Sequence, residues 1–168
     1  MRKGLEALQR HRCPRWEEFP NIDLYMDQVL TFLNKHLEGI FLLNNEKFLT
    51  SSMVNNYVKY GIVEKPIKKK YNRTHLAYLY VLCLFKKVYS MEEISSLMKL
   101  QIEFSDIETS YNTFCNEMEL CILNLFEKEK KYMENDDGDA VKLLKEVIQS
   151  VVSALYVEAV IYDKKHTK

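Results

Sequence analysis

Residues 50–71 read TSSMVNNYVKYGIVEKPIKKKY. Thr50 or Ser51 is suited to cap a helix, because the hydroxyl of either can accept a hydrogen bond from a free backbone N–H of the first turn. Gly61 follows about ten residues later, where helices commonly end in the left-handed conformation. Next comes a lysine-rich loop, in which residues 67–71 are expected to form a short extended hairpin. A capped helix, a glycine stop and a basic hairpin together predict a winged helix-turn-helix.

Helical spacing of apolar residues predicts further helices on both sides of this stretch. Asn21 is expected to cap a helix over residues 21–37, and Asn72 to cap the helix after the wing. Ser90 and Glu93 have the spacing of a capping box for one more helix. The inner face of the first of these helices is expected to comprise Ile22, Tyr25, Met26, Val29, Leu30, Leu33 and Leu37.

The last third of the chain has the pattern of a helical hairpin that turns at residues 136–139. Its first helix carries a heptad seam of Ile107, Tyr111, Phe114, Met118, Cys121 and Leu125. Its second helix has a wide apolar face between Val141 and Val160. So much apolar surface must be buried against the rest of the chain or against a second copy. Tyr111, Phe114 and Tyr156 could line an effector pocket, although aromatic residues at helical spacing more commonly form a core.

Composition indicates a folded protein that is neutral as a whole but locally polarised. The chain has 168 residues, 47% of them hydrophobic, and no formal net charge. Residues 50–75 hold six basic residues against one acidic residue, whereas residues 101–139 hold eleven acidic residues against three lysines. One face is therefore expected to attract a polyanion and another to repel it. Alternatively, the acidic residues of 101–139 form an ordinary solvated helix surface.

Several classes of site and location are not supported by the sequence. The four cysteines lack the spacing of metal ligands and resemble the reduced, buried cysteines of a cytoplasmic protein. No apolar run is long enough for a membrane span. His11, His36, His75 and His166 are scattered, so we expect no metal and no cofactor. With no phosphate loop and no nucleophile motif, we expect no enzyme.

A DNA-binding function is the hypothesis that best uses the basic stretch. Asn55 and Asn56 lie on the outward face of the predicted helix, and asparagine can pair with the adenine edge in the major groove. Lysines of the loop suit phosphate contacts that position a protein without reading sequence. The alternative is a capped surface helix followed by a solvated basic loop. The candidate DNA-binding residues are Ser52, Asn55, Asn56, Lys59, Lys65, Lys68, Lys69, Lys70 and Arg73.

Three blocks of the sequence resemble MerR-type regulators. Residues 54–63 resemble their recognition helix, residues 71–79 the end of their wing and the next helix, and residues 89–94 the start of the helix after that. The whole chain, through residues 16–20 and 67–71, also resembles a family of uncharacterised Firmicute proteins. These are described as a domain of unknown function and generally regarded as MerR-like putative transcriptional regulators.

The chain departs from the MerR pattern at several places. Asn55 stands where an arginine is usual, and lysines 68–70 replace the arginines of the wing. Val88 replaces a usual glycine, with the spacing there one residue shorter. About twelve residues, 38–49, lie where the MerR family has a short turn.

The resemblance implies a specific architecture and function. We expect an all-α fold with a small β-wing: a basic lead-in over 1–20, a MerR-like winged-helix domain over 21–100, and a helical hairpin over 101–168 for dimerisation or effector binding. The expected function is transcriptional regulation by a homodimer that reads a pseudo-palindromic site on double-stranded DNA, with room for a small-molecule effector. The alternative is a protein-interaction module on a retained winged-helix scaffold.

Overall fold

A computed structural model describes residues 3–41, 48–102, 106–127 and 138–166. Within these ranges the chain folds into seven α-helices and a small two-stranded antiparallel sheet. The mostly helical architecture predicted from the sequence is therefore confirmed. The elements are α1 (Lys3–Arg10), the 3₁₀ helix η1 (Trp16–Glu18), β1 (Leu24–Tyr25), α2 (Met26–Leu37), α3 (Ser51–Lys59), β2 (Lys70–Tyr71), α4 (Arg73–Phe85), α5 (Met91–Ile102), α6 (Ile107–Phe126) and α7 (Asp139–His166).

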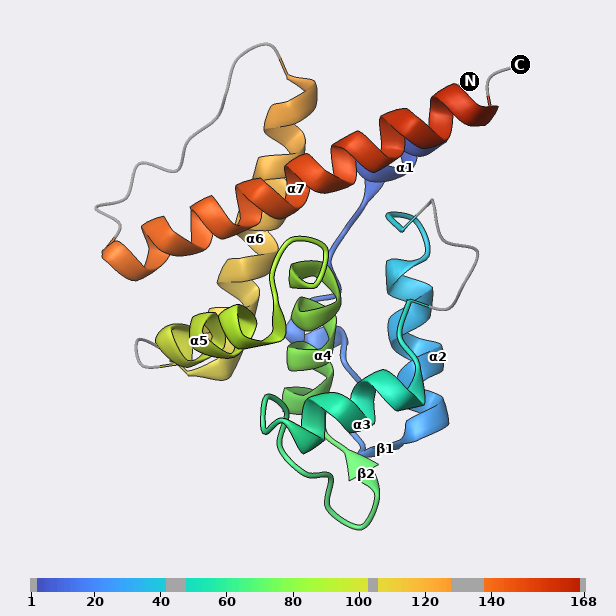
Figure 1. Cartoon of the computed structure of the whole chain (residues 1–168). Helices are drawn as coiled ribbons and strands as arrows, with labels where there is room; N and C mark the ends of the chain where they lie inside the picture. Colours follow the sequence, from blue (N-terminus) through green and yellow to red (C-terminus); the bar gives the residue numbers. More distant parts are fainter. Residues whose placement is uncertain (1–2, 42–47, 103–105, 128–137, 167–168) are drawn as a thin grey trace.

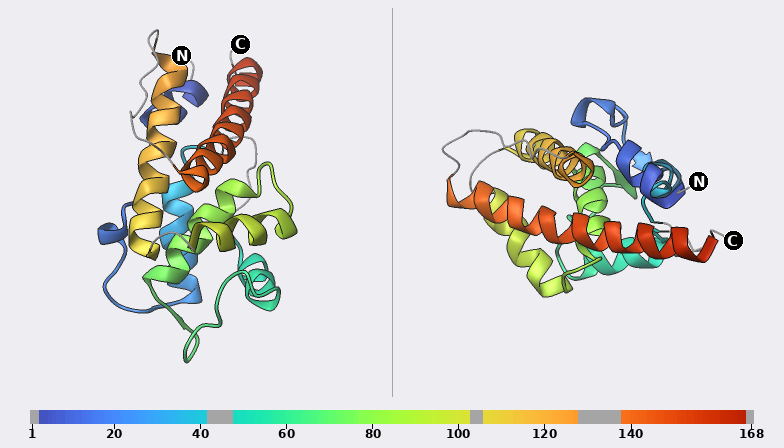
Figure 2. Two further views of the ribbon diagram at one scale, coloured as in Figure 1. Left: turned by 90° about the vertical axis from the view of Figure 1, so that its left-hand side faces the viewer. Right: turned by 90° about the horizontal axis from the view of Figure 1, so that it is seen from above.

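The two ends of the chain pack together over the rest of the fold. Helix α7 has 28 residues, so it is about 42 Å long, and it crosses above the other helices (Figures 1 and 2). Helix α1 lies against its C-terminal half. The carboxylate of Asp163 accepts the backbone N–H groups of Gly4 (2.7 Å) and Leu5 (3.1 Å), which are free at the start of α1. The lead-in thus packs on the C-terminal hairpin.

Helix α4 forms the centre of the core. Ten of its thirteen residues are buried, including Tyr80, which is completely shielded from solvent. The helix begins as predicted, because the Oδ1 atom of Asn72 accepts the backbone N–H of His75 at 3.2 Å. Its lower end faces the sheet and α3, and its upper end approaches α7 (Figure 1). A helix that is apolar on almost every side must be surrounded by other elements.

The C-terminal helices bury their apolar faces within this single chain. Tyr111, Phe114 and Met118 of the predicted seam are buried, and α7 buries a row from Leu144 to Ala159. Cys121 and Leu125 are only partly buried, whereas Cys115 and Ile122 are buried in addition to the predicted seam. The buried stripe on α6 also includes the side that faces the lead-in, where the Tyr111 hydroxyl donates to the carbonyl of Pro14 at 2.6 Å.

The start of α2 differs from the sequence-based prediction. Asn21 is not its N-cap, since Leu24 and Tyr25 are extended and pair with Tyr71 and Lys70, and the helix begins at Met26. Ile22 was expected on the inner face of this helix but lies outside it, with 71% of its surface exposed. The pairing with β2 keeps the backbone before Met26 out of the helical conformation.

Other expectations have mixed outcomes. All four cysteines are free, as predicted; Cys13, Cys83 and Cys115 are buried, whereas Cys121, which was also expected to be buried, is only partly so. No helix in the described ranges is long and apolar enough to cross a membrane. After α2 the chain turns at residues 38–40. Residues 42–47 and the first half of the predicted turn at 136–139, residues 136 and 137, lie outside the described residues.

Candidate nucleic-acid interface

Helix α3 forms with the bounds that its caps predict. The Oγ1 atom of Thr50 accepts the backbone N–H of Met53 at 3.3 Å. At the other end, Gly61 has a φ of +70°, and the N–H of Ile62 donates to the carbonyl of Tyr57 at 3.0 Å. This is the left-handed C-cap that the glycine indicated. Both ends of the helix are therefore fixed by hydrogen bonds that lie within the segment itself.

The packing of α3 determines which side chains face outward. Val54 and Tyr57 are buried against the core, and burial raises the pKa of Tyr57 to about 12, so its hydroxyl stays neutral. The opposite face is exposed and consists of Ser52, Asn55, Asn56 and Lys59. Within the described residues, these four side chains form no hydrogen bond or ion pair. They are thus available to an external partner.

An asparagine on α2 holds the start of α3. The side chain of Asn34 accepts the backbone N–H of Leu49 at 2.9 Å and donates to the carbonyl of the same residue at 3.0 Å. Leu49 is fully buried and immediately precedes the cap residue Thr50. This two-bond clamp fixes α3 against α2 even though the connection between them is longer than the short turn of MerR-type proteins. The sequence analysis missed it, because nothing in the helical pattern distinguishes Asn34 from a solvent-facing residue.

The predicted wing, residues 67–71, forms a tight hairpin whose tip consists of two lysines. Ile67 bridges Lys70, whose N–H donates to the Ile67 carbonyl at 2.9 Å. Between them, Lys68 and Lys69 have φ angles of +50° and +62°. Two consecutive left-handed residues are typical of the turn type that normally carries asparagine and glycine. Both lysine side chains are exposed.

Two of the candidate residues interact with the N-terminal segment. The ammonium group of Lys70 lies 5.1 Å from the ring centre of Tyr25, within the range of a cation–π interaction. The Nε atom of Arg73 donates to the carbonyl of Phe19 at 3.2 Å, and the side chain is partly buried. Arg73 is therefore tied to the lead-in, whereas Lys65 is exposed like the lysines of the tip. Tyr25 is a member of this surface that the sequence analysis placed in the core.

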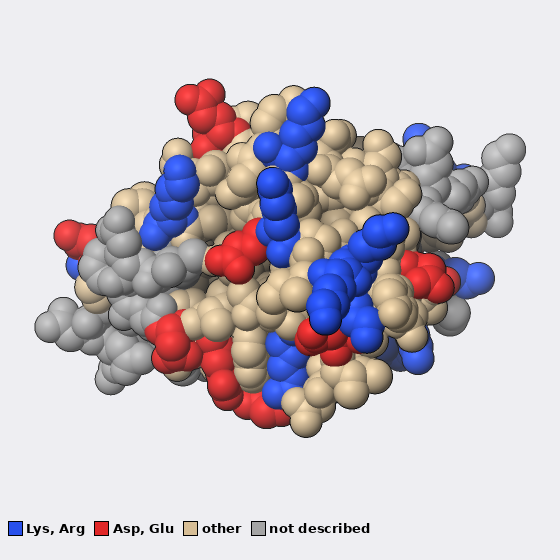
Figure 3. Space-filling model, turned by 90° about the horizontal axis from the view of Figure 1, so that it is seen from below, with Lys and Arg blue, Asp and Glu red and all other residues tan. Residues whose placement is uncertain are grey.

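The exposed candidates gather at one end of the molecule. Helix α3, the sheet and the wing lie together at the lower end in Figure 1. Seen from below, that face carries many lysine and arginine side chains near its centre, with acidic side chains among them and along one edge (Figure 3). Asp23 and Glu64 are exposed acidic residues next to the sheet and the wing. The face is thus enriched in cations without being uniformly basic.

The structure offers little other chemistry. In the parts of the chain that it describes, no three histidine, cysteine, aspartate or glutamate side chains are placed to hold a metal ion. His75 has a pKa below its ordinary value because burial disfavours its charged form, and the nearby carbonyl oxygens and the carboxylate of Glu64 only partly offset this. The neutral imidazole accepts the backbone N–H of Asn72 at 3.0 Å and so stabilises the start of α4.

Comparison with known families matches residues 14–116 to the Domain of unknown function (DUF1836). The chain belongs to this family. The matched region runs from the lead-in through α5 and ends within α6, so it contains α3, the wing and all nine candidate residues. No curated protein and no solved structure matches the chain. The DUF1836 region therefore includes the whole of the basic stretch over residues 50–75.

Proposed function

We propose that this DUF1836 protein is a transcriptional regulator that binds double-stranded DNA through a MerR-like winged helix-turn-helix. Helix α2 and helix α3 form the helix pair, α3 enters the major groove, and the hairpin at residues 67–71 is the wing. In this arrangement Asn55 and Asn56 read base edges, as bidentate asparagine–adenine pairs do. The exposed lysines contact phosphates and fix the register of the protein on the duplex.

The conformation of the wing tip is the observation that carries this proposal. A non-glycine residue in the left-handed region costs about 1 kcal/mol or more, and Lys68 and Lys69 both adopt it. Glycine or asparagine would form the same turn at lower cost. The fold therefore gives up stability to present two exposed ammonium groups at the tip of a projecting hairpin. The phosphate backbone of a nucleic acid is the partner that binds such a pair of cations most directly.

The regulator is proposed to act as a homodimer, so that two α3 helices meet the two halves of a pseudo-palindrome. Much of the apolar surface of α6 and α7 is already covered within one chain. The apolar side chains that remain exposed on the C-terminal half of α7 are Tyr156, Val157 and Ile161. Val157 and Ile161 are four residues apart and are therefore neighbours on one face of the helix, with Tyr156 to one side, so the three form a small apolar patch that a second copy can cover.

A salt titration tests the proposal directly. Fragments of the source genome are selected for binding at low salt, and the affinity of a selected fragment is then measured at increasing salt concentration. The double variant Lys68→Gly, Lys69→Gly keeps the turn and removes both cations. We expect the slope of log affinity against log salt to become shallower by about two, since each phosphate contact contributes about 0.9.

The matched control removes the same charge from the far end of the molecule. Lys164 and Lys165 are exposed at the C-terminal end of α7, and the variant Lys164→Ala, Lys165→Ala should leave the slope unchanged. A wild-type protein that binds no fragment at low salt would refute the proposal. An equal loss of slope in the control pair would refute the role of the wing, because net charge alone would then explain the effect.

The interaction-module alternative has one observation in its favour. Three large apolar side chains near the same face are exposed: Ile22 and Ile67 at 71% and Tyr60 at 68%. A protein partner that covers them would bind through apolar burial, with an affinity that changes little with salt. The same titration therefore distinguishes the two functions, since DNA binding must weaken steeply as salt increases.

A further inference from the structure

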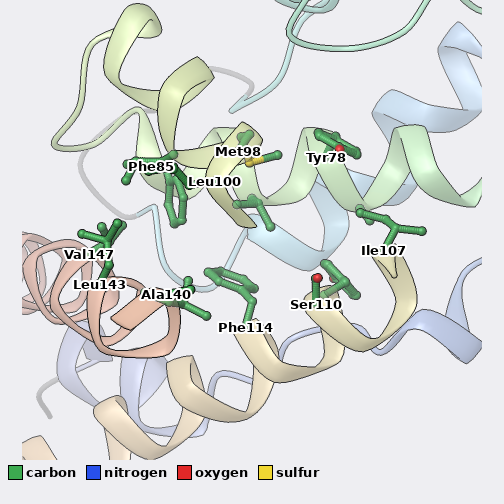
Figure 4. A pocket seen from close by; sticks show the side chains of 15 residues that line it. Tyr78, Phe85, Met98, Leu100, Ile107, Ser110, Phe114, Ala140, Leu143 and Val147 are labelled. Carbon is green, nitrogen blue, oxygen red and sulfur yellow. The ribbon is translucent and has the colours of Figure 1, made fainter. Parts of the chain in front are cut away.

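An apolar cavity lies between α4, α5, α6 and α7, away from the proposed DNA-binding face. Its volume is about 70 Å³, several times the roughly 10–15 Å³ that one water molecule requires. Figure 4 shows Tyr78 and Phe85 of α4, Met98 of α5, Phe114 of α6 and Leu143 of α7 around it. Tyr111 and Phe114, for which the sequence favoured a core role over a pocket, are buried and also line this cavity, whereas Tyr156 does not.

The lining of the cavity determines the chemistry of its occupant. Among the described residues that line it, none is charged, and the polar side chains are limited to hydroxyl groups. The hydroxyl of Tyr111 donates to the carbonyl of Pro14, so it is already satisfied on the far side of its ring. Water gains few hydrogen bonds in such a site, whereas an apolar molecule loses none. The site therefore favours a small uncharged apolar ligand.

Two exposed leucines provide the edge of the cavity with an apolar rim. Leu100 on α5 is 44% exposed, and Leu143 on α7 is 41% exposed. Exposed apolar side chains at the mouth of an apolar cavity leave a path from solvent, and they gain burial when a ligand covers them. The cavity is in this respect a pocket and not a sealed packing defect.

Helix α5 connects this pocket with the segment that follows α3. Over residues 91–100, Ile94 is the only fully buried side chain of α5, so the helix is held by few core contacts. Met98 of α5 lines the apolar pocket on one side and a second, more polar cavity on the other, and Tyr78 of α4 does the same. The second cavity is also lined by residues 61–64, which link α3 to the wing. A ligand that shifts Met98 therefore also changes the wall of the second cavity, against which residues 61–64 lie.

From this geometry we infer that the pocket binds a small apolar effector and that its occupancy alters DNA affinity. The enclosed volume of about 70 Å³ is about half of the roughly 150 Å³ that holds a benzene molecule, so a single aromatic ring lies partly in the cavity and partly against the exposed rim of Leu100 and Leu143. The regulatory half of this inference rests on the proposed function, whereas the binding half does not. The ligand fills the space between Phe85, Phe114 and Leu143, and it positions α5 through Met98. Positioning of α5 then favours one arrangement of residues 61–64, and hence of the wing relative to α3.

The binding half is tested with toluene as the probe. The full-length chain is labelled at its methyl groups, and NMR spectra are recorded as toluene is added. We expect saturable shifts at the methyl groups that line the pocket, such as those of Val81, Leu97 and Val147, and none at the exposed methyl groups of Val157. Absence of saturation up to the aqueous solubility of toluene, or shifts spread evenly over the protein, would overturn the assignment.

Variants at the pocket make the test specific. Ala140→Phe fills the cavity from the first turn of α7, and Leu143→Glu places a charge at its rim. Each should weaken toluene binding at least tenfold. Leu123→Glu is the matched control, because Leu123 on α6 is 38% exposed and lies outside the pocket lining. Two pocket variants are used because, if Ala140→Phe fails to fold, toluene binding to Leu143→Glu still tests the site. Undiminished binding in a folded pocket variant would overturn the site.

The regulatory half is tested by measuring DNA affinity with and without saturating toluene. We expect a change of about fivefold or more, the lower end of typical allosteric coupling, in the wild type but not in Leu143→Glu. Toluene binding without any DNA binding would support the pocket and refute the proposed function. A DNA affinity that is the same with and without bound toluene would overturn the regulatory role, although the proposed function would stand.

Discussion

The asparagine clamp between α2 and α3 gives the sharpest prediction about how this interface is held. Asn34→Ala removes both hydrogen bonds to the backbone of Leu49, at 2.9 and 3.0 Å. Because Leu49 is fully buried, its N–H and carbonyl lose their partners inside the protein. Each group left unsatisfied costs about 1–3 kcal/mol, and the lower part of that range applies because both hydrogen bonds are only partly buried. We therefore expect the free energy of unfolding to fall by about 2–4 kcal/mol.

Urea denaturation followed by circular dichroism measures this loss, and amide hydrogen exchange locates it. The amide of Leu49 should lose most of its protection in Asn34→Ala. Asn34→Asp keeps the acceptor for that amide but loses the donor to the carbonyl, so the amide of Leu49 should keep more of its protection than in the alanine variant.

Asn112 supplies a matched control for the clamp. Its Oδ1 atom accepts one backbone N–H, from Trp16 at 3.1 Å, so Asn112→Ala should cost about half as much and leave the exchange of Leu49 unchanged. A loss below about 0.5 kcal/mol in Asn34→Ala, together with unchanged protection of Leu49, would refute the idea that this clamp positions α3. DNA affinity should fall in Asn34→Ala by more than in Asn112→Ala.

Two further predictions concern stability. Burial, followed by the charges of His36 and Arg12, lowers the pKa of His11 to about 4, so the unfolded chain binds a proton below about pH 6.5 while the folded chain does not. Stability should therefore fall by up to about 3 kcal/mol as pH falls from 6.5 to 4, and urea titrations should show a smaller fall in His11→Gln. Gly61→Ala should cost about 1 kcal/mol because its φ is +70°, whereas Gly39→Ala should be nearly neutral in the same assay.

The caps of α3, α4 and α5 were predictable, unlike that of α2, because their hydrogen bonds join residues close in sequence. Thr50 accepts from Met53, Asn72 accepts from His75, and the backbone of Ser90 donates to Glu93 at 2.7 Å. Each pair is three residues apart, so both partners can be read in one short window. Gly61 belongs to the same class, since its backbone conformation depends on the local turn. These signals fixed the bounds of α3 and the start of α4.

Interactions between distant segments were not predictable from the same patterns. Tyr25 looked like a member of a helical face, yet β1 pairs with β2 about 46 residues further along the chain. A strand of two residues carries no alternation from which to infer its partner. The clamp of Asn34 on Leu49 was equally unpredictable, because a single asparagine on a helix gives no indication of its hydrogen-bond partner. The residues of the candidate DNA-binding face could thus be listed from the sequence. The strand pairing and the asparagine clamp that hold this face in place could not.

The central helix α4 explains how one small fold can join the two proposed sites. Its first turn begins next to β2, where Asn72 fixes the end of the wing, and its later turns present Tyr78 and Phe85 to the apolar pocket. A helix with ten buried residues of thirteen moves as a rigid rod, since any bend would break close-packed contacts. The element that responds to the ligand in this proposal is therefore α5, whose described side chains are mostly exposed or half-buried. Coupling between pocket and wing should consequently be lost when Met98 is shortened to alanine: toluene should still shift the methyl signals of Val81 and Val147, but the measured DNA affinity should no longer respond to it.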